Sequence, residues 1–119
     1  NARLYTRSFY TAESWMQMVY DELSNNRPIY YAGASESGGA HAFVVDGYDQ
    51  DGMVHVNWGW GGSYNGMYDI SLLNPTGYEF SASQDMILGM CDSTSIFHTN
   101  LRLVPVNCLS LFMVLLLRE

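Results

Sequence analysis

The stretch that decides the fold is GGAHAFVVDGYDQDGMVHVNWGWGG, residues Gly38 to Gly62. An apolar segment at 40–48 is followed by the turn sequence DQDG, whose Asp-Gly pair favours a tight hairpin. Residues 53–60 then alternate in polarity, as in a strand with one buried face. One face of that strand is predicted to carry Met53, His55 and Asn57, and the other Val54, Val56 and Trp58. The stretch therefore predicts two antiparallel strands at 40–48 and 53–60.

A helix is predicted before this hairpin, from Thr11 to about Asn25. Thr11 is a good N-cap, and an acidic residue follows it in the first turn. Trp15, Val19 and Leu23 recur at four-residue spacing and form one apolar stripe. Pro28 then ends the helix, because proline lacks the N–H that a helix interior needs.

Three further strands are predicted from composition and turn signals. One strand is predicted at 28–34, PIYYAGA, because it is rich in β-branched and aromatic residues. Another is predicted at 67–73, MYDISLL, and ends at Asn74-Pro75. A candidate fifth strand is DMILGM at 85–90. The expected fold is α+β, with one N-terminal helix followed by an antiparallel meander.

The pattern changes after Met90. Residues 91–119 lack an alternation that continues the sheet, and their apolar run at 108–117 is well short of the roughly 20 residues that span a bilayer. We therefore assign residues 1–90 to one domain and leave 91–119 as an unassigned tail. The start of another domain, a frameshifted end and an unplaced strand pair all remain open for it.

Composition excludes several classes of partner. Five arginines and no lysine oppose twelve acidic residues, giving a net charge of −7. Nucleic acids and anionic membrane surfaces are disfavoured, because both require clustered basic residues. No cofactor or metal is predicted: Cys91 and Cys108 lack a zinc spacing, and the Asp46, Asp49 and Asp51 carboxylates are better explained as turn acids than as a calcium loop.

His41 is the candidate catalytic residue. It follows Gly38-Gly39-Ala40, which lets a substrate chain approach closely, and the hairpin should bring Asn57 and Trp58 back beside it. A histidine base needs such a neighbour to hold its second ring nitrogen. The alternative is an ordinary structural histidine, which is also the interpretation we favour for His55. His98 is given no role.

The segment ELSNNRPIYYAGASESGGAHAFVVDGYDQDGMVHVNWGWGGSYNGMYDISLLNP resembles the C-terminal half of streptopain-type cysteine peptidases, the papain-like family C10 of bacteria. HAFVVDGY joined to HVNWGWGG at this spacing carries the resemblance. It implies the C-terminal half-barrel of a papain-like fold, with His41 as catalytic base and Trp58 as the residue that orients it. Asn57 is the alternative orienting group, and the resemblance places Trp60, together with Gly39 and Ala40, at the substrate cleft.

The same resemblance implies a second half of the site. The family's nucleophilic cysteine and oxyanion donors lie in its N-terminal half, and neither cysteine here has the glycine-rich approach or helix N-terminus that activates a thiol. We therefore expect an inactive fragment of a secreted, zymogen-derived endopeptidase, whose partners are a protein or peptide substrate and the cysteine-bearing half. A non-catalytic binding or inhibitor module and a truncated remnant are the alternatives.

Overall fold

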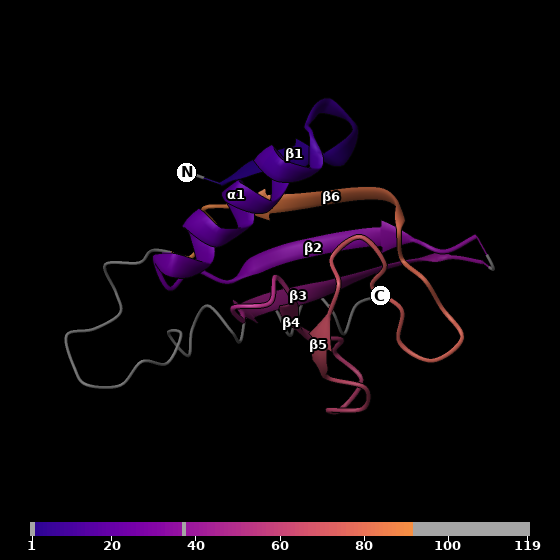
Figure 1. Cartoon of the computed structure of the whole chain (residues 1–119). Coiled ribbons are helices and arrows are strands. Elements are labelled where there is room, and N and C mark those ends of the chain that lie inside the picture. Colours follow the sequence, from indigo (N-terminus) through magenta and orange to yellow (C-terminus); the bar gives the residue numbers. More distant parts are fainter. Residues whose placement is uncertain (1, 37, 92–119) are drawn as a thin grey trace.

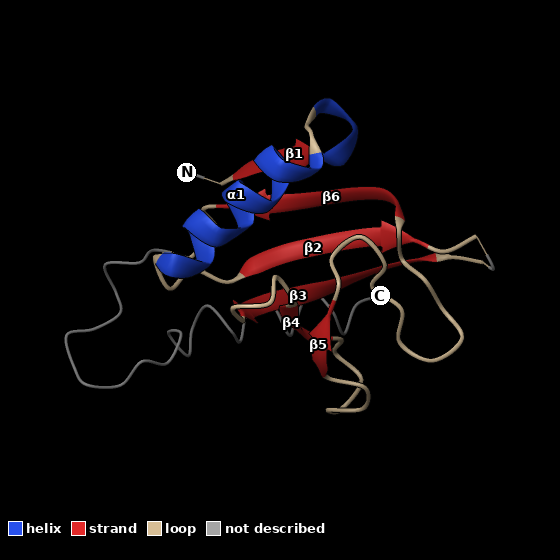
Figure 2. Ribbon diagram, in the orientation of Figure 1, coloured by secondary structure: helices blue, strands red, loops and turns tan. Residues whose placement is uncertain are grey.

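The computed structural model describes residues 2–36 and 38–91 (Figure 1). Within these residues the fold is one α-helix and one antiparallel, open sheet of six strands in the order β1-β6-β2-β3-β4-β5, shown by element type in Figure 2. The elements are β1 (Arg3–Thr6), a 3-10 turn η1 (Arg7–Phe9), α1 (Ala12–Ser24), β2 (Ile29–Ala34), β3 (Ala40–Tyr48), β4 (Val54–Asn57), β5 (Gly66–Tyr68) and β6 (Ala82–Leu88).

The predicted helix is confirmed as α1. Thr11 forms a capping box with Ser14: each side chain accepts a hydrogen bond from the other residue's backbone N–H. The stripe of Trp15, Val19 and Leu23 is buried, and α1 packs against β2 and β3. The apolar face of the helix thus forms one layer of the core and the sheet forms the other.

The hairpin around residues 49–52 is also confirmed, with β3 covering all of the predicted 40–48. Val45 pairs with Val56, so the buried side of β4 lies on the same face as Phe43 and Val45. β4 is shorter than predicted and ends at Asn57 rather than at residue 60. It ends there because Gly59 has a φ of +80°, which turns the chain away from the ladder.

The strand predicted at 67–73 was wrong beyond Tyr68. β5 ends there, and Asp69 folds the next residues into a turn. The Asp69 carboxylate accepts hydrogen bonds from the hydroxyl and the backbone N–H of Ser71, and these two bonds lower its pKa. Such a local acceptor competes with the sheet for the backbone donors, which a strand pattern does not reveal.

The sheet is not a simple meander, because β6 returns across it. β6 lies between β1 and β2, where Ile87 pairs with Leu4 on one side and with Tyr30 on the other. β6 begins at Ala82, before the predicted 85, and β1 was not predicted at all. His98 and Cys108 of the predicted tail lie outside the described residues, and the boundary at residue 90 stays a prediction.

A buried hydrogen-bond chain joins the helix, the sheet and the loop before β6. Trp15 Nε1 donates to the Tyr31 hydroxyl (2.8 Å), which donates to Gln84 Oε1 (2.6 Å). Burial raises the pKa of Tyr31 far above its ordinary value, so the hydroxyl keeps its proton and remains a donor. Gln84 Nε2 donates to the carbonyls of Ile70 and Phe80, and so fixes both ends of that loop.

Replacing Gly33 tests how closely this loop is held to the sheet. A Cβ at Gly33 would lie 2.3 Å from the Phe80 carbonyl oxygen, so Gly33→Ala must displace the loop. We expect a loss of about 1–3 kcal/mol in the free energy of unfolding, measured by urea titration.

Gly66→Ala is the matched control, since a Cβ there meets nothing within 4 Å and Gly66 also lies in a strand. It should change the free energy of unfolding by less than about 1 kcal/mol. Equal effects of the two substitutions would show that the Phe80 loop is not in close contact with β2.

Candidate active site

His41 lies at the start of β3, opposite Gly33 of β2. Two glycines with φ of +133° and +82°, Gly38 and Gly39, bring the chain into the strand, and the Gly39 carbonyl accepts a hydrogen bond from Ser35 N. His41 shares a face with Phe43 and is half-buried, so its ring borders the core without being enclosed by it.

The His41 ring is held by a main-chain carbonyl. His41 Nε2 lies 2.8 Å from the carbonyl oxygen of Trp58. A carbonyl oxygen can only accept, so this bond requires the proton on Nε2. In the neutral ring, Nδ1 then carries the lone pair and is the nitrogen able to take a proton.

Trp58 is itself fixed from both sides. Its backbone N–H donates to Asn65 Oδ1 (3.0 Å) and its indole Nε1 donates to the Tyr64 carbonyl (3.0 Å), while the side chain is fully buried. Asn65 was not predicted as a site residue, because the Asn65-Gly66 sequence is typical of an ordinary turn.

Aromatic rings surround the imidazole. Trp60 stacks on His41 with ring centroids 4.9 Å apart and planes inclined by 20°. Phe80 and Phe43 follow at 5.8 and 6.0 Å, and the Trp58 ring lies at 6.4 Å. Phe80 was not predicted as a site residue, because it reaches His41 from a loop with no periodic pattern.

Asn57 does not share this arrangement. It pairs with Val44, so its side chain points to the face opposite His41 and Trp58. Its Oδ1 accepts a hydrogen bond from Gly59 N at 3.0 Å, which stabilises the turn after β4. Of the two orienting groups considered, the geometry favours Trp58, and the contact is made by its carbonyl.

A cleft of about 210 Å³ opens beside the imidazole. The three residues that the sequence assigned to substrate binding, Gly39, Ala40 and Trp60, all border it together with His41. Its remaining lining residues are Gly38, Tyr78 and Phe80. The structure therefore gathers His41 and the three predicted substrate-binding residues around one cavity, while Trp58 contacts the His41 ring without lining the cleft.

His55 and the acidic residues of the β3–β4 turn make contacts that stabilise the fold, and they do not line the cleft. His55 Nδ1 lies 2.6 Å from Asp46 Oδ1 in a cross-strand pair. Asp49 accepts hydrogen bonds from the backbone N–H groups of Asp51 and Met53, as expected of a turn acid. Within residues 2–36 and 38–91 there is no group of three metal-ligating side chains, and no helix there is long and apolar enough to cross a bilayer.

Cys91 lies far from His41. β6 begins at Ala82, level with the start of β3, and ends at Leu88 at the other end of the sheet. At a rise of roughly 3.3 Å per residue, these two ends of β6 lie about 20 Å apart. Cys91 follows that distant end, is buried and is not a free thiol. In the part of the chain that the structure describes, His41 thus has no thiol within reach.

Comparison with known proteins gives consistent matches. The chain is 47% identical over 91 residues to the thiol protease/hemagglutinin PrtT of Porphyromonas gingivalis, and this alignment covers 71% of the chain. It is 46% identical over 70 residues, 59% of this chain, to streptopain of Streptococcus pyogenes.

Two solved structures share the fold. The active wild-type interpain A cysteine protease of Prevotella intermedia matches 72% of this chain with a TM-score of 0.69 and 48% identity. A prointerpain A fragment of the same species matches 82% with a TM-score of 0.61 and 43% identity. Both confirm the predicted papain-like cysteine protease fold.

The chain spans only part of these relatives: 10% of PrtT, 17% of streptopain, and 37% and 29% of the two interpain chains. The family model named Peptidase C10 matches residues 1–68, which include β1 to β5 and His41. The chain therefore belongs to the Peptidase C10 family of cysteine peptidases.

Proposed function

We propose that this chain supplies the histidine side of a cysteine endopeptidase active site, with His41 as general base and acid. The observation that carries the proposal is the hydrogen bond between His41 Nε2 and the Trp58 carbonyl. It leaves Nδ1 as the basic nitrogen of a ring that borders an open cleft.

The reaction would proceed by acyl transfer. His41 Nδ1 takes the proton of a cysteine thiol, and the thiolate attacks the carbonyl carbon of the scissile peptide bond. The C–N bond breaks as the Nδ1–H proton passes to the leaving amine, and water then releases the acyl group from sulfur. Protein or peptide substrates follow from this chemistry.

The surroundings of His41 suit a ring that becomes charged during the reaction. In the imidazolium, Nε2 keeps its hydrogen bond to the Trp58 carbonyl while Nδ1 also carries a proton. The stacked Trp60 ring presents a π face to that charge at 4.9 Å. Both contacts favour the ion pair with a thiolate, which is the reactive form of a cysteine nucleophile.

We propose that the nucleophile and oxyanion donors come from an N-terminal, cysteine-bearing half of the same catalytic domain, so that this chain alone is inactive. The distance of Cys91 from His41 supports this, as does the 37% share of interpain A that the chain spans. We also propose, from the resemblance in sequence alone, that the parent protein is a secreted enzyme made as a zymogen.

Inhibitor labelling tests whether the chain carries its own nucleophile. An epoxide inhibitor of cysteine peptidases should not modify the isolated chain, because it needs a reactive thiolate beside His41. Intact-mass spectrometry after incubation is the measurement. Labelling at Cys91 or Cys108, accompanied by peptide hydrolysis, would contradict the proposal.

Substitution of His41 tests the catalytic role itself. When a cysteine-bearing N-terminal half is supplied and peptidase activity appears, His41→Ala should lower kcat/KM by a factor on the order of 10³ or more. A fluorogenic peptide assay measures this effect.

His55→Ala is the matched control, because it removes the other described histidine from the same sheet without touching the cleft. Its kcat/KM should stay close to that of the parent chain, with a change confined to thermal stability. Undiminished activity in His41→Ala would rule out His41 as the base.

A further inference from the structure

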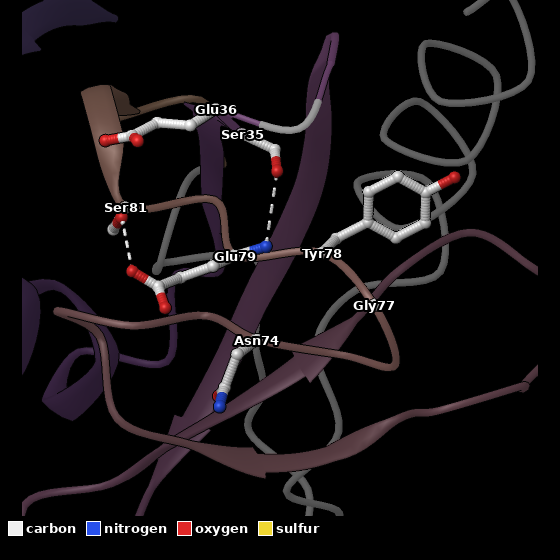
Figure 3. Close-up of a pocket in the computed structure, with 7 residues that line it drawn as sticks. All are labelled: Ser35, Glu36, Asn74, Gly77, Tyr78, Glu79 and Ser81. Atoms are coloured by element: carbon white, nitrogen blue, oxygen red, sulfur yellow. Dashed lines mark hydrogen bonds between the residues drawn. The ribbon is translucent and has the colours of Figure 1, made fainter.

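A second, larger groove adjoins the His41 cleft. It has a volume of about 500 Å³ and is bordered by Ser35 and Glu36 of the β2–β3 connection and by Tyr78, Glu79 and Ser81 of the segment before β6 (Figure 3). Tyr78 lines both cavities. Its ring stacks on Phe80 at 5.5 Å and lies 6.4 Å from the Trp60 ring, so the ring belongs to the His41 side.

The His41 cleft is too small to hold a peptide by itself. Its volume of about 210 Å³ falls below the roughly 300–1,000 Å³ of ordinary small-ligand sites, and an endopeptidase substrate is larger than such ligands. A peptide whose scissile bond lies at His41 must therefore continue into neighbouring space. The groove beyond Tyr78 adjoins the cleft directly and has room for a long side chain.

The charged groups that line this groove are all acidic. Figure 3 shows the Glu36 and Glu79 side chains extending to the same side of the groove, with Ser81 between them. Glu79 Oε2 accepts a hydrogen bond from the Ser81 hydroxyl at 2.9 Å, which restricts that carboxylate. Neither glutamate takes part in a salt bridge among the described residues.

The groove is also held in shape by main-chain contacts. Glu79 N donates to the Ser35 hydroxyl across the groove (3.4 Å), and Gln84 fixes the Phe80 carbonyl one residue later. Ser35 is 9% exposed and is therefore anchored in the body of the domain. Glu36 and Glu79 thus extend from two segments that are joined by a hydrogen bond. This bond fixes the distance between the two sides of the groove.

We propose that this groove is a substrate subsite that accepts a lysine or arginine side chain of the peptide, with Glu36 and Glu79 as the residues that determine this specificity. The proposal rests on the proposed peptidase function of the His41 cleft. A cationic side chain four or more bonds long enters past Tyr78 and places its charge between carboxylates that lack a cationic partner in the described chain.

Peptide titrations of the ¹⁵N-labelled 119-residue chain test the subsite without requiring activity. The probes are N-acetylated, C-amidated alanine pentapeptides with lysine at each position in turn, each matched by a norleucine peptide that has the same carbon chain without the charge. At least one lysine peptide should shift the backbone amide signals of Glu36 and Glu79. Its Kd should be roughly two- to fivefold lower than that of its norleucine match, as expected for partly exposed charge pairs.

The double variant Glu36→Gln/Glu79→Gln should abolish this preference, and Glu13→Gln, an exposed glutamate on α1, should preserve it. Raising the salt concentration should weaken the lysine preference as well. Equal affinity for lysine and norleucine peptides, a preference that survives in the double variant, or no shift of groove signals with any peptide would each overturn the proposal.

Activity measurements separate this inference from the function on which it depends. Lysine-dependent groove binding by a chain that stays inactive with a cysteine-bearing half would contradict the proposed function and leave the subsite intact. Activity that requires His41 but shows no lysine preference would contradict the subsite alone.

Discussion

The hydrogen bond from His41 Nε2 to the Trp58 carbonyl is the contact on which the candidate site depends. A main-chain acceptor has a fixed position only if the chain on both sides of it is fixed. Here β4 holds one side through its pairing with β3, and Asn65 and Tyr64 hold the amide and the indole of Trp58. The Trp-Gly-Trp-Gly-Gly sequence therefore ends the strand, directs a carbonyl at the imidazole and returns the Trp60 ring over it.

The Phe80 side of the cleft depends on the buried hydrogen-bond chain from Trp15 through Tyr31 to Gln84. Gln84 uses both of its amide hydrogens on the carbonyls of Ile70 and Phe80, while its oxygen accepts from Tyr31. Since a half-satisfied buried amide costs free energy, the arrangement favours one loop conformation over alternatives. The bare α-carbon of Gly33 gives the Phe80 carbonyl the space it needs. The helix residue Trp15 is thus linked to the Phe80 wall of the cleft through Tyr31 and Gln84.

Local patterns explain which features sequence alone could predict. The helix, the hairpin and the approach of Trp58 to His41 follow from residues near one another in the chain, where periodicity and turn chemistry act directly. The place of Trp60 at the cleft was implied by the family resemblance. β1 and the placement of β6 depend on pairing between the two ends of the domain, for which a single sequence has no signal. The choice of Trp58 over Asn57 needed strand pairing, and the use of a main-chain carbonyl cannot be read from residue types. Phe80 and Tyr78 were missed because they act from an irregular segment, and Gln84 was missed because it lies in the part of β6 that precedes the predicted strand at 85–90.

The tautomer of His41 tests this account most directly, and the isolated chain suffices for the measurement. In ¹⁵N NMR spectra that correlate the imidazole nitrogens with the ring protons, at a pH where His41 is neutral, Nε2 should have the shift of a protonated nitrogen and Nδ1 that of an unprotonated one. The same spectra contain the signals of His55, whose ring contacts Asp46 instead of a main-chain carbonyl, and these signals serve as an internal comparison. A His41 ring protonated on Nδ1, or one that exchanges evenly between tautomers, would contradict the hydrogen bond to Trp58 and with it the assignment of Nδ1 as the base.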